Sequence, residues 1–111
     1  MLPRADVARI RKLCAERVTA DASDQLRIEC EEDPRAVTVV EWRPPWREDY
    51  GPDWIRLPIA RLRYVGSKRL WALYYHRHTG RWERYPLLGP ATRIDPLLDE
   101  LEHDPICLFW R

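Results

Sequence analysis

Two histidines stand at the spacing of a metal-binding pair. His76 and His78 form an H-x-H motif, and alternate residues of one strand point to the same side. His78, however, falls in a predicted turn, and the neighbouring arginines, Arg77 and Arg81, disfavour a bound cation. The motif therefore predicts no metal site.

Three carboxylates gather in a proline-rich segment, residues 44–58. Carboxylates can act as general bases or hold magnesium, as in a nuclease. Three arginines close in sequence favour ion pairs that shape the loop instead, and the chain has no glycine-rich phosphate loop and no G-x-S-x-G motif. We predict no catalytic residue and no cofactor, with a small hydrolase centred on this segment as the alternative. The carboxylates are Glu48, Asp49 and Asp53, and the arginines are Arg43, Arg47 and Arg56.

Length and charge bound the class of protein. With 111 residues, 45% of them hydrophobic, the chain is long enough for one core, and we expect one domain over residues 1–111. The formal net charge of +1 names no partner, but residues 41–85 carry ten basic and five acidic side chains between acidic flanks. This basic block is either a binding face or a solvated sheet whose arginines pair with those acids.

The three cysteines, Cys14, Cys30 and Cys107, include no C-x-x-C pair. They predict neither a disulfide framework nor a zinc knuckle, and Cys14 lies in the apolar stripe of a predicted helix, as a small buried hydrophobe would. No segment approaches the ~20 apolar residues of a membrane span. We expect a protein of the reducing cytoplasm with no membrane partner.

The apolar pattern predicts an α+β fold with an N-terminal helix, a five-stranded antiparallel meander, a C-terminal helix and a short apolar tail. Apolar residues at steps of three and four predict the first helix over residues 5–18. Asp95, followed by Pro96, is expected to cap the second. Short turns require antiparallel pairing, and after residue 85 the chain should leave the sheet. The strands are predicted over residues 26–30, 36–43, 59–65, 68–77 and 81–85.

Turn chemistry predicts the register of the last three strands. If residues 66–67 form a two-residue turn, Leu62 pairs with Trp71. If a glycine completes the next turn, His76 pairs with Trp82. One face of the sheet is then apolar, and both helices should cover it. That face collects Ala60, Leu62, Tyr64, Trp71, Leu73, Tyr75 and Tyr85.

The other face mixes arginines with aromatic rings. Arginines on alternate residues of a strand stand about 7 Å apart, and rings beside them offer stacking to nucleic acid bases. We expect this face to bind single-stranded nucleic acid or a protein, unless the proline-rich loop and the C-terminal tail cover it. The candidate binding residues are Arg61, Arg63, Tyr74, His76, Trp82 and Arg84, with Arg43 and Trp46 from the adjoining segment.

Several motifs resemble those of one protein family. The motifs "RPPW", "WALYYHR" and "RWERY", with Ala60 and Tyr64 between them and "DPICLFW" near the end, are similar to a family of small uncharacterised bacterial proteins, known only as a domain of unknown function. The similarity covers nearly the whole chain. The resemblance implies one compact domain and supplies no activity.

Two classes of function remain open from the sequence. The first is a non-catalytic binding module that uses the basic and aromatic face, and a homodimer that hides this face is one form of it. The second is the hydrolase centred on residues 44–58. Binding of single strands with a steep salt dependence and without turnover would favour the first.

Overall fold

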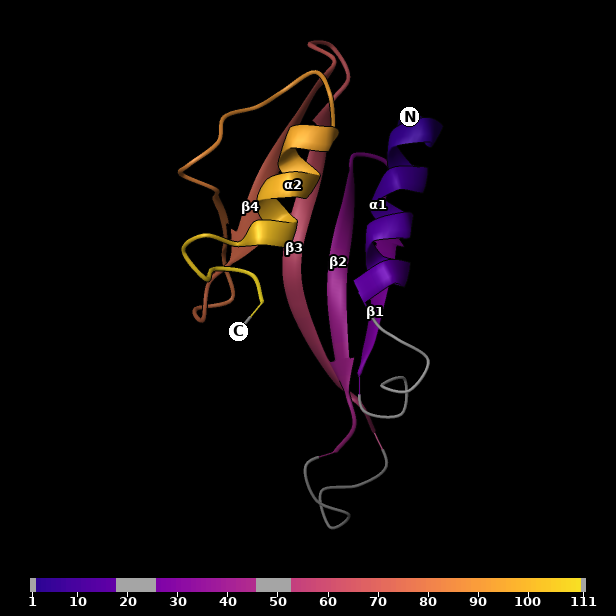
Figure 1. Ribbon diagram of the computed structural model, residues 1–111, viewed down its shortest axis with the longest axis vertical. Helices are drawn as coiled ribbons and strands as arrows, with labels where there is room; N and C mark the ends of the chain where they lie inside the picture. Colours follow the sequence, from indigo (N-terminus) through magenta and orange to yellow (C-terminus); the bar gives the residue numbers. More distant parts are fainter. Residues whose placement is uncertain (1, 18–25, 46–52, 111) are drawn as a thin grey trace.

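The computed structural model describes residues 2–17, 26–45 and 53–110. In them, five antiparallel strands form one sheet in chain order, so that each strand pairs with the next (Figure 1). The predicted α+β fold is confirmed in element order and in pairing. The elements are α1 (Arg4–Arg17), β1 (Arg27–Glu32), β2 (Ala36–Arg43), β3 (Ile55–Val65), β4 (Leu70–His76), β5 (Trp82–Arg84) and α2 (Asp95–His103).

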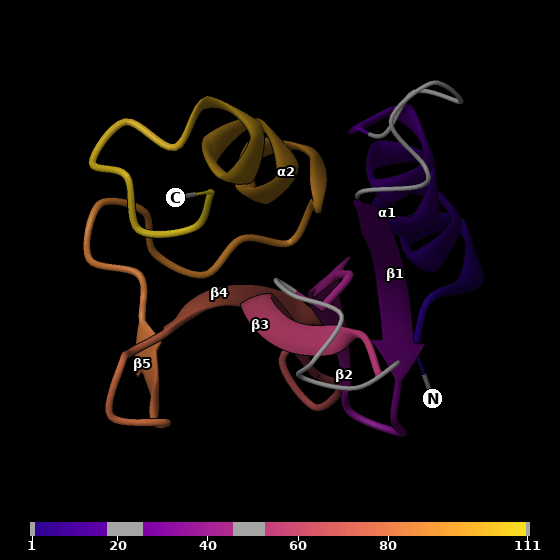
Figure 2. The same ribbon diagram turned by 90° about the horizontal axis from the view of Figure 1, so that it is seen from below.

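Both helices lie on the same side of the sheet, as Figure 2 shows for β2, β3 and β4. The core is the single cluster between them and that face of the sheet. Each fully buried large apolar side chain stabilises the fold by roughly 1.5–3 kcal/mol. The covered face is the predicted one, since Leu62, Trp71, Leu73 and Tyr85 are all buried in the cluster.

The loop between β3 and β4 corrects the predicted register. It spans residues 66–69 rather than 66–67, so Tyr64 faces Trp71 and Leu62 faces Leu73. Arg69 takes a left-handed conformation, with φ 52°, to close this longer loop. The register is wrong by two residues, and a shift of two leaves the side chains of residues 60–65 and 70–76 on their predicted faces, because side chains alternate with a period of two.

The next hairpin has the predicted register. His76 faces Trp82, and Gly80 has φ 87°, a conformation that glycine adopts without steric cost. Past β5, the chain does not simply leave the sheet: Trp71 and Ala91 exchange backbone hydrogen bonds of 2.8 and 2.9 Å. This contact continues the edge beside β4.

Strand β3 starts at Ile55, four residues before its predicted start, and contains Pro58. A proline cannot donate a ladder hydrogen bond, and in a central strand it is tolerated at a bulge. The register shifts here, because Val39 pairs with Ala60 while Val40 pairs with Pro58. Ile59 is the extra residue of the bulge and is buried in the core.

Helix α2 begins differently from the prediction. Its N-cap is Ile94, without a side-chain cap, and Asp95 lies inside the first turn. The Asp95 carboxylate instead accepts hydrogen bonds from Arg9 of α1 at 2.8 and 3.0 Å. The Asp95 carboxylate therefore binds Arg9 of the other helix and does not cap α2.

The C-terminal tail docks on the helix side. Asp104, at φ 43°, ends α2, and its buried carboxylate accepts hydrogen bonds from the backbone N–H groups of residues 108–110 at 2.8 to 3.2 Å. The Phe109 ring lies 5.2 Å from that of Tyr85. Phe109 is buried in the core on this side, while Ile106 stays exposed, and the tail does not lie over the opposite face.

Candidate functional site

The face of the sheet turned away from the helices, which we call the open face, carries six of the eight candidate residues. Strand alternation sets them opposite the core residues of β3, β4 and β5. Arg63 and Arg84 are exposed, and the others are partly buried. On β3, β4 and β5 the polar and aromatic residues of the open face are Arg61, Arg63, Tyr74, His76, Trp82 and Arg84. On β1 and β2 the same face carries Glu29 and Glu31 and the buried residues Ala36, Thr38 and Val40.

One cross-strand row runs through the middle of this face. Arg61 of β3 pairs with Tyr74 of β4, and Tyr74 pairs with Arg84 of β5. Neighbouring strands lie about 4.8 Å apart, so the backbones of the two arginines are roughly 10 Å apart, with Tyr74 on the strand between them. A tyrosine with arginines on both neighbouring strands offers a ring that can stack on a base and guanidinium groups that can bind phosphates.

Arg61 is held in place by the turn between β1 and β2. Its guanidinium donates to the Asp33 carboxylate at 2.9 Å and to the Thr38 hydroxyl at 3.2 Å. Burial opposes ionisation of Asp33, yet hydrogen bonds from the backbone N–H groups of Arg35 and Ala36 and the nearby Arg61 charge keep its pKa below the ordinary value. Arg61 therefore contributes a positioned but largely compensated charge.

A second group of basic residues lies where β3 ends. Arg35 and Arg63 line a hollow of about 260 Å³ with Gly66, and Lys68 and Arg69 follow in the same loop. Within the described part of the chain, none of these four side chains, nor Arg84, has a carboxylate partner within ion-pair distance. We call this group of Arg35, Arg63, Lys68 and Arg69 the basic end of the open face. The positive charge that no described carboxylate compensates is concentrated at the basic end and at Arg84 of β5.

His76 and Trp82 form the other end of the open face. Their rings meet edge to face, with centroids 4.9 Å apart, and both line a hollow of about 310 Å³ together with Pro58 and Thr38. Arg56 reaches the same hollow but forms a bidentate ion pair with Glu31, whose pKa this hydrogen bonding lowers. This hollow is electrostatically mixed, unlike the basic end.

Two candidate residues do not join the open face. Arg43 alternates with Val37, Val39 and Glu41 on the helix side, and its Nε donates to Glu41 at 3.0 Å. Trp46 lies outside the described residues. Arg43 and Arg56 bind glutamates of β2 and β1, and the expected pairing of the loop carboxylates with arginines stays a prediction. Glu48, Asp49 and Arg47 also lie outside the described residues.

Sequence reasoning missed the residues of the turn after β1. Asp33, in "EEDPR", orients Arg61 across two strands and accepts two backbone hydrogen bonds in its own turn. An aspartate before proline is a common turn residue, so the turn itself carried a signal. No sequence pattern indicated that Asp33 contacts Arg61, because this contact depends on the β2–β3 register.

The histidine pair does not gain ligands in the fold. Across residues 2–17, 26–45 and 53–110, no three His, Cys, Asp or Glu side chains are grouped so that they could hold a metal ion. At the end of α2, His103 Nδ1 lies 2.7 Å from the Asp99 carbonyl oxygen. Neither described helix has the length and apolar character needed to cross a membrane.

The fold and the open face together define an α+β protein with an antiparallel meander, covered by helices on one face and basic and aromatic on the other. The chain belongs to the family "Domain of unknown function (DUF3024)", whose model matches residues 2–111. No curated protein and no solved structure matches the chain.

Proposed function

We propose that this protein is a non-catalytic binding module that takes single-stranded nucleic acid on its open face. The observation that carries the proposal is the row in which Tyr74 pairs with Arg61 on one side and Arg84 on the other. Each stacked base typically contributes about 1–3 kcal/mol to binding, and guanidinium groups suit phosphate oxygens by geometry and by charge.

The distribution of ion pairs supports a polyanionic ligand. On the helix side, basic residues such as Arg4, Arg9 and Arg11 are held by carboxylates of the same chain. On the open face and its basic end, Arg63 and Arg84 are exposed and meet no carboxylate among the described residues. Phosphates would supply the missing negative charge and release counterions.

Binding of labelled oligo(dT) and oligo(U) at low and moderate salt, followed by fluorescence anisotropy, tests the proposal. We expect binding that weakens steeply with salt and is lost in Arg63→Ala/Arg84→Ala. Each neutralised phosphate contributes about 0.7 to the logarithmic salt slope of a single strand, so any residual binding should show a slope lower by roughly 1 to 1.5.

The matched control is Lys12→Ala/Arg93→Ala, which removes the same charge from exposed positions on the helix side. Equal losses in both double variants would show unspecific attraction and reject the open face as the site. Absence of binding by the folded wild type at low salt would reject the nucleic-acid ligand. A dimer in sedimentation that Trp82→Ala dissociates would instead identify a second copy of the chain as the occupant.

The alternative function, a hydrolase centred on residues 44–58, remains a prediction. Of its carboxylates only Asp53 lies among the described residues, and it is exposed. Turnover of the same oligonucleotides, followed by gel electrophoresis in the presence of magnesium and abolished in Asp53→Asn, would support this alternative over the binding module.

A further inference from the structure

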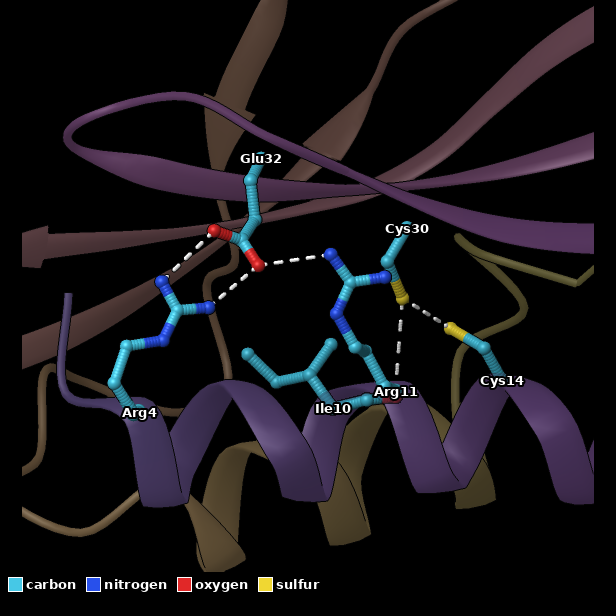
Figure 3. A network of polar contacts seen from close by, with 6 residues as sticks. All are labelled: Arg4, Ile10, Arg11, Cys14, Cys30 and Glu32. Carbon is cyan, nitrogen blue, oxygen red and sulfur yellow. Dashed lines mark hydrogen bonds and ion pairs between the residues drawn. The ribbon is translucent and has the colours of Figure 1, made fainter.

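Two cysteines that are 16 residues apart meet between α1 and β1. The sulfur atoms of Cys14 and Cys30 lie 2.8 Å apart, and both residues are free thiols (Figure 3). Cys30 Sγ also lies 3.9 Å from the Ile10 carbonyl oxygen. The third cysteine, Cys107, is exposed and lies in the C-terminal segment.

Local periodicity and a paired carboxylate bring the two thiols together. Cys14 follows Val7 and Ile10 on the buried stripe of α1, and Cys30 alternates with Glu32 on the side of β1 that faces this helix. Glu32 accepts hydrogen bonds from Arg4 at 2.7 and 3.1 Å and from Arg11 at 2.8 Å. This network, drawn in Figure 3, holds the helix on the strand next to the sulfur atoms.

The two thiols are chemically unequal. The hydrogen bond between the two sulfur atoms lowers the pKa of Cys30, and the Arg11 charge acts in the same direction, against the opposing effects of burial and of the Glu32 charge. The same hydrogen bond and burial raise the pKa of Cys14. Cys30 is also only partly buried, whereas Cys14 is 4% exposed. Cys30 is therefore the thiol suited to react first, since the thiolate is the nucleophile.

We propose that Cys14 and Cys30 are a peroxide-reactive dithiol that closes reversibly into a disulfide between α1 and β1. The sulfur atoms would move by less than 1 Å to reach the bond length of about 2.05 Å. Cys30 is only partly buried, which leaves its side chain accessible to a small oxidant from solvent.

The reaction balances with hydrogen peroxide as the oxidant. The Cys30 thiolate attacks one peroxide oxygen, the O–O bond breaks, and the departing hydroxide takes up a proton to become water, leaving Cys30 as a sulfenic acid. The Cys14 sulfur then attacks the Cys30 sulfur, the S–O bond breaks, and a second water leaves with the Cys14 proton. Two thiols lose two electrons, and one peroxide becomes two waters. A dithiol reductant reverses the step by exchange.

Peptide mapping of the native wild-type protein after peroxide treatment tests the proposal without any substitution at the pair. We expect a Cys14–Cys30 cross-linked peptide under non-reducing conditions, and its disappearance after dithiothreitol. A native protein in which peroxide modifies Cys107 while Cys14 and Cys30 stay reduced would overturn the proposal, as would a cross-link that forms only in urea.

Two variants in a Cys107→Ser background assign the order of the steps. Cys14→Ser should leave a Cys30 sulfenic acid that a dimedone probe captures, whereas Cys30→Ser should give little capture at Cys14. Capture at Cys14 alone would contradict the assigned roles. In the protein that keeps both cysteines, oxidation should raise the midpoint of thermal unfolding by roughly 10 °C or more, the scale expected for a disulfide that closes a loop of this size. An unchanged midpoint would show that no disulfide forms.

Discussion

The two faces of the sheet both carry tryptophan and tyrosine, but the rings have different surroundings. On the covered face, Trp71 is fully buried, its Nε1–H donates to Asp6 at 2.8 Å, and its ring lies 5.0 Å from that of Tyr64. On the open face, Trp82 is partly exposed and contacts His76 edge to face. Similar residue types thus serve core packing on one side and form an accessible surface on the other.

The polar groups follow the same division. On the helix side, Tyr85 donates to Glu100 at 2.6 Å, and burial together with this bond raises the pKa of the tyrosine. Trp110 donates to the Leu101 carbonyl at 2.7 Å, and the Arg17 guanidinium lies over its ring at 3.7 Å. On the open face, Arg63 and Arg84 extend into solvent. These donors of the helix side thus have partners within the chain, whereas Arg63 and Arg84 meet no carboxylate among the described residues.

The largest expected difference between the faces is in stability. Trp71→Ala should lower the free energy of unfolding by about 3–5 kcal/mol, because it removes a large, fully buried ring. Trp82→Ala should cost about 1 kcal/mol, the scale of one aromatic pair. Urea denaturation of both variants measures the two losses, and equal values would mean that the faces are not distinguished by packing.

The tail on the helix side should also be sensitive to one carboxylate. Asp104→Ala should lower the free energy of unfolding by about 2–3 kcal/mol, because three backbone N–H groups lose a charged acceptor. Asp104→Asn keeps the left-handed backbone accessible and should cost less. The exposed Asp99→Ala on the same helix serves as the control for lost charge. Equal losses in the free energy of unfolding for Asp104→Ala and Asp99→Ala, measured by chemical denaturation, would contradict the role of Asp104 in anchoring the tail.

Within the open face, substitutions of two neighbouring arginines should differ less in their effect on the free energy of unfolding. Arg61→Ala should cost about 0.5–1 kcal/mol, because a partly exposed ion pair is screened by solvent. Arg63→Ala should stay within about 0.5 kcal/mol of the wild type, as surface substitutions do, while its effect on nucleic-acid binding is the larger. Paired denaturation and anisotropy measurements check this, and a more destabilising Arg63→Ala would place that side chain in a structural contact.

The smallest effect concerns pH on the helix side. Hydrogen bonds from Arg4 and Arg11 lower the pKa of Glu32 from 4.5 to about 2. A lowered folded-state pKa stabilises the fold above the unfolded value, and this contribution is lost as pH falls from 4.5 through about 2. Because other carboxylates titrate there too, we compare urea midpoints of wild type and Glu32→Gln. The wild type should be slightly more stable at neutral pH, and the difference should shrink as pH falls through about 2. A constant difference would show that ionisation of Glu32 is not responsible.

Much of the fold follows from short-range patterns. The sequence predicts both helices, five strands in order and the residues on each face, and even the wrong turn after Val65 keeps the faces correct because the error is two residues. The early start of β3 was missed because Pro58 disfavours a central strand, and only the bulge beside Val40 explains how it is accommodated.

The sequence by itself determined which side chains lie on which face, since periods of two and of about 3.6 residues are properties of the local backbone. Only the tertiary structure decided which charges remain available and which thiols meet. Asp33 compensates Arg61 and leaves Arg63 free of an ion pair among the described residues, and Cys14 reaches Cys30 because α1 docks along β1. These contacts depend on register and docking between distant segments, which no local pattern encodes.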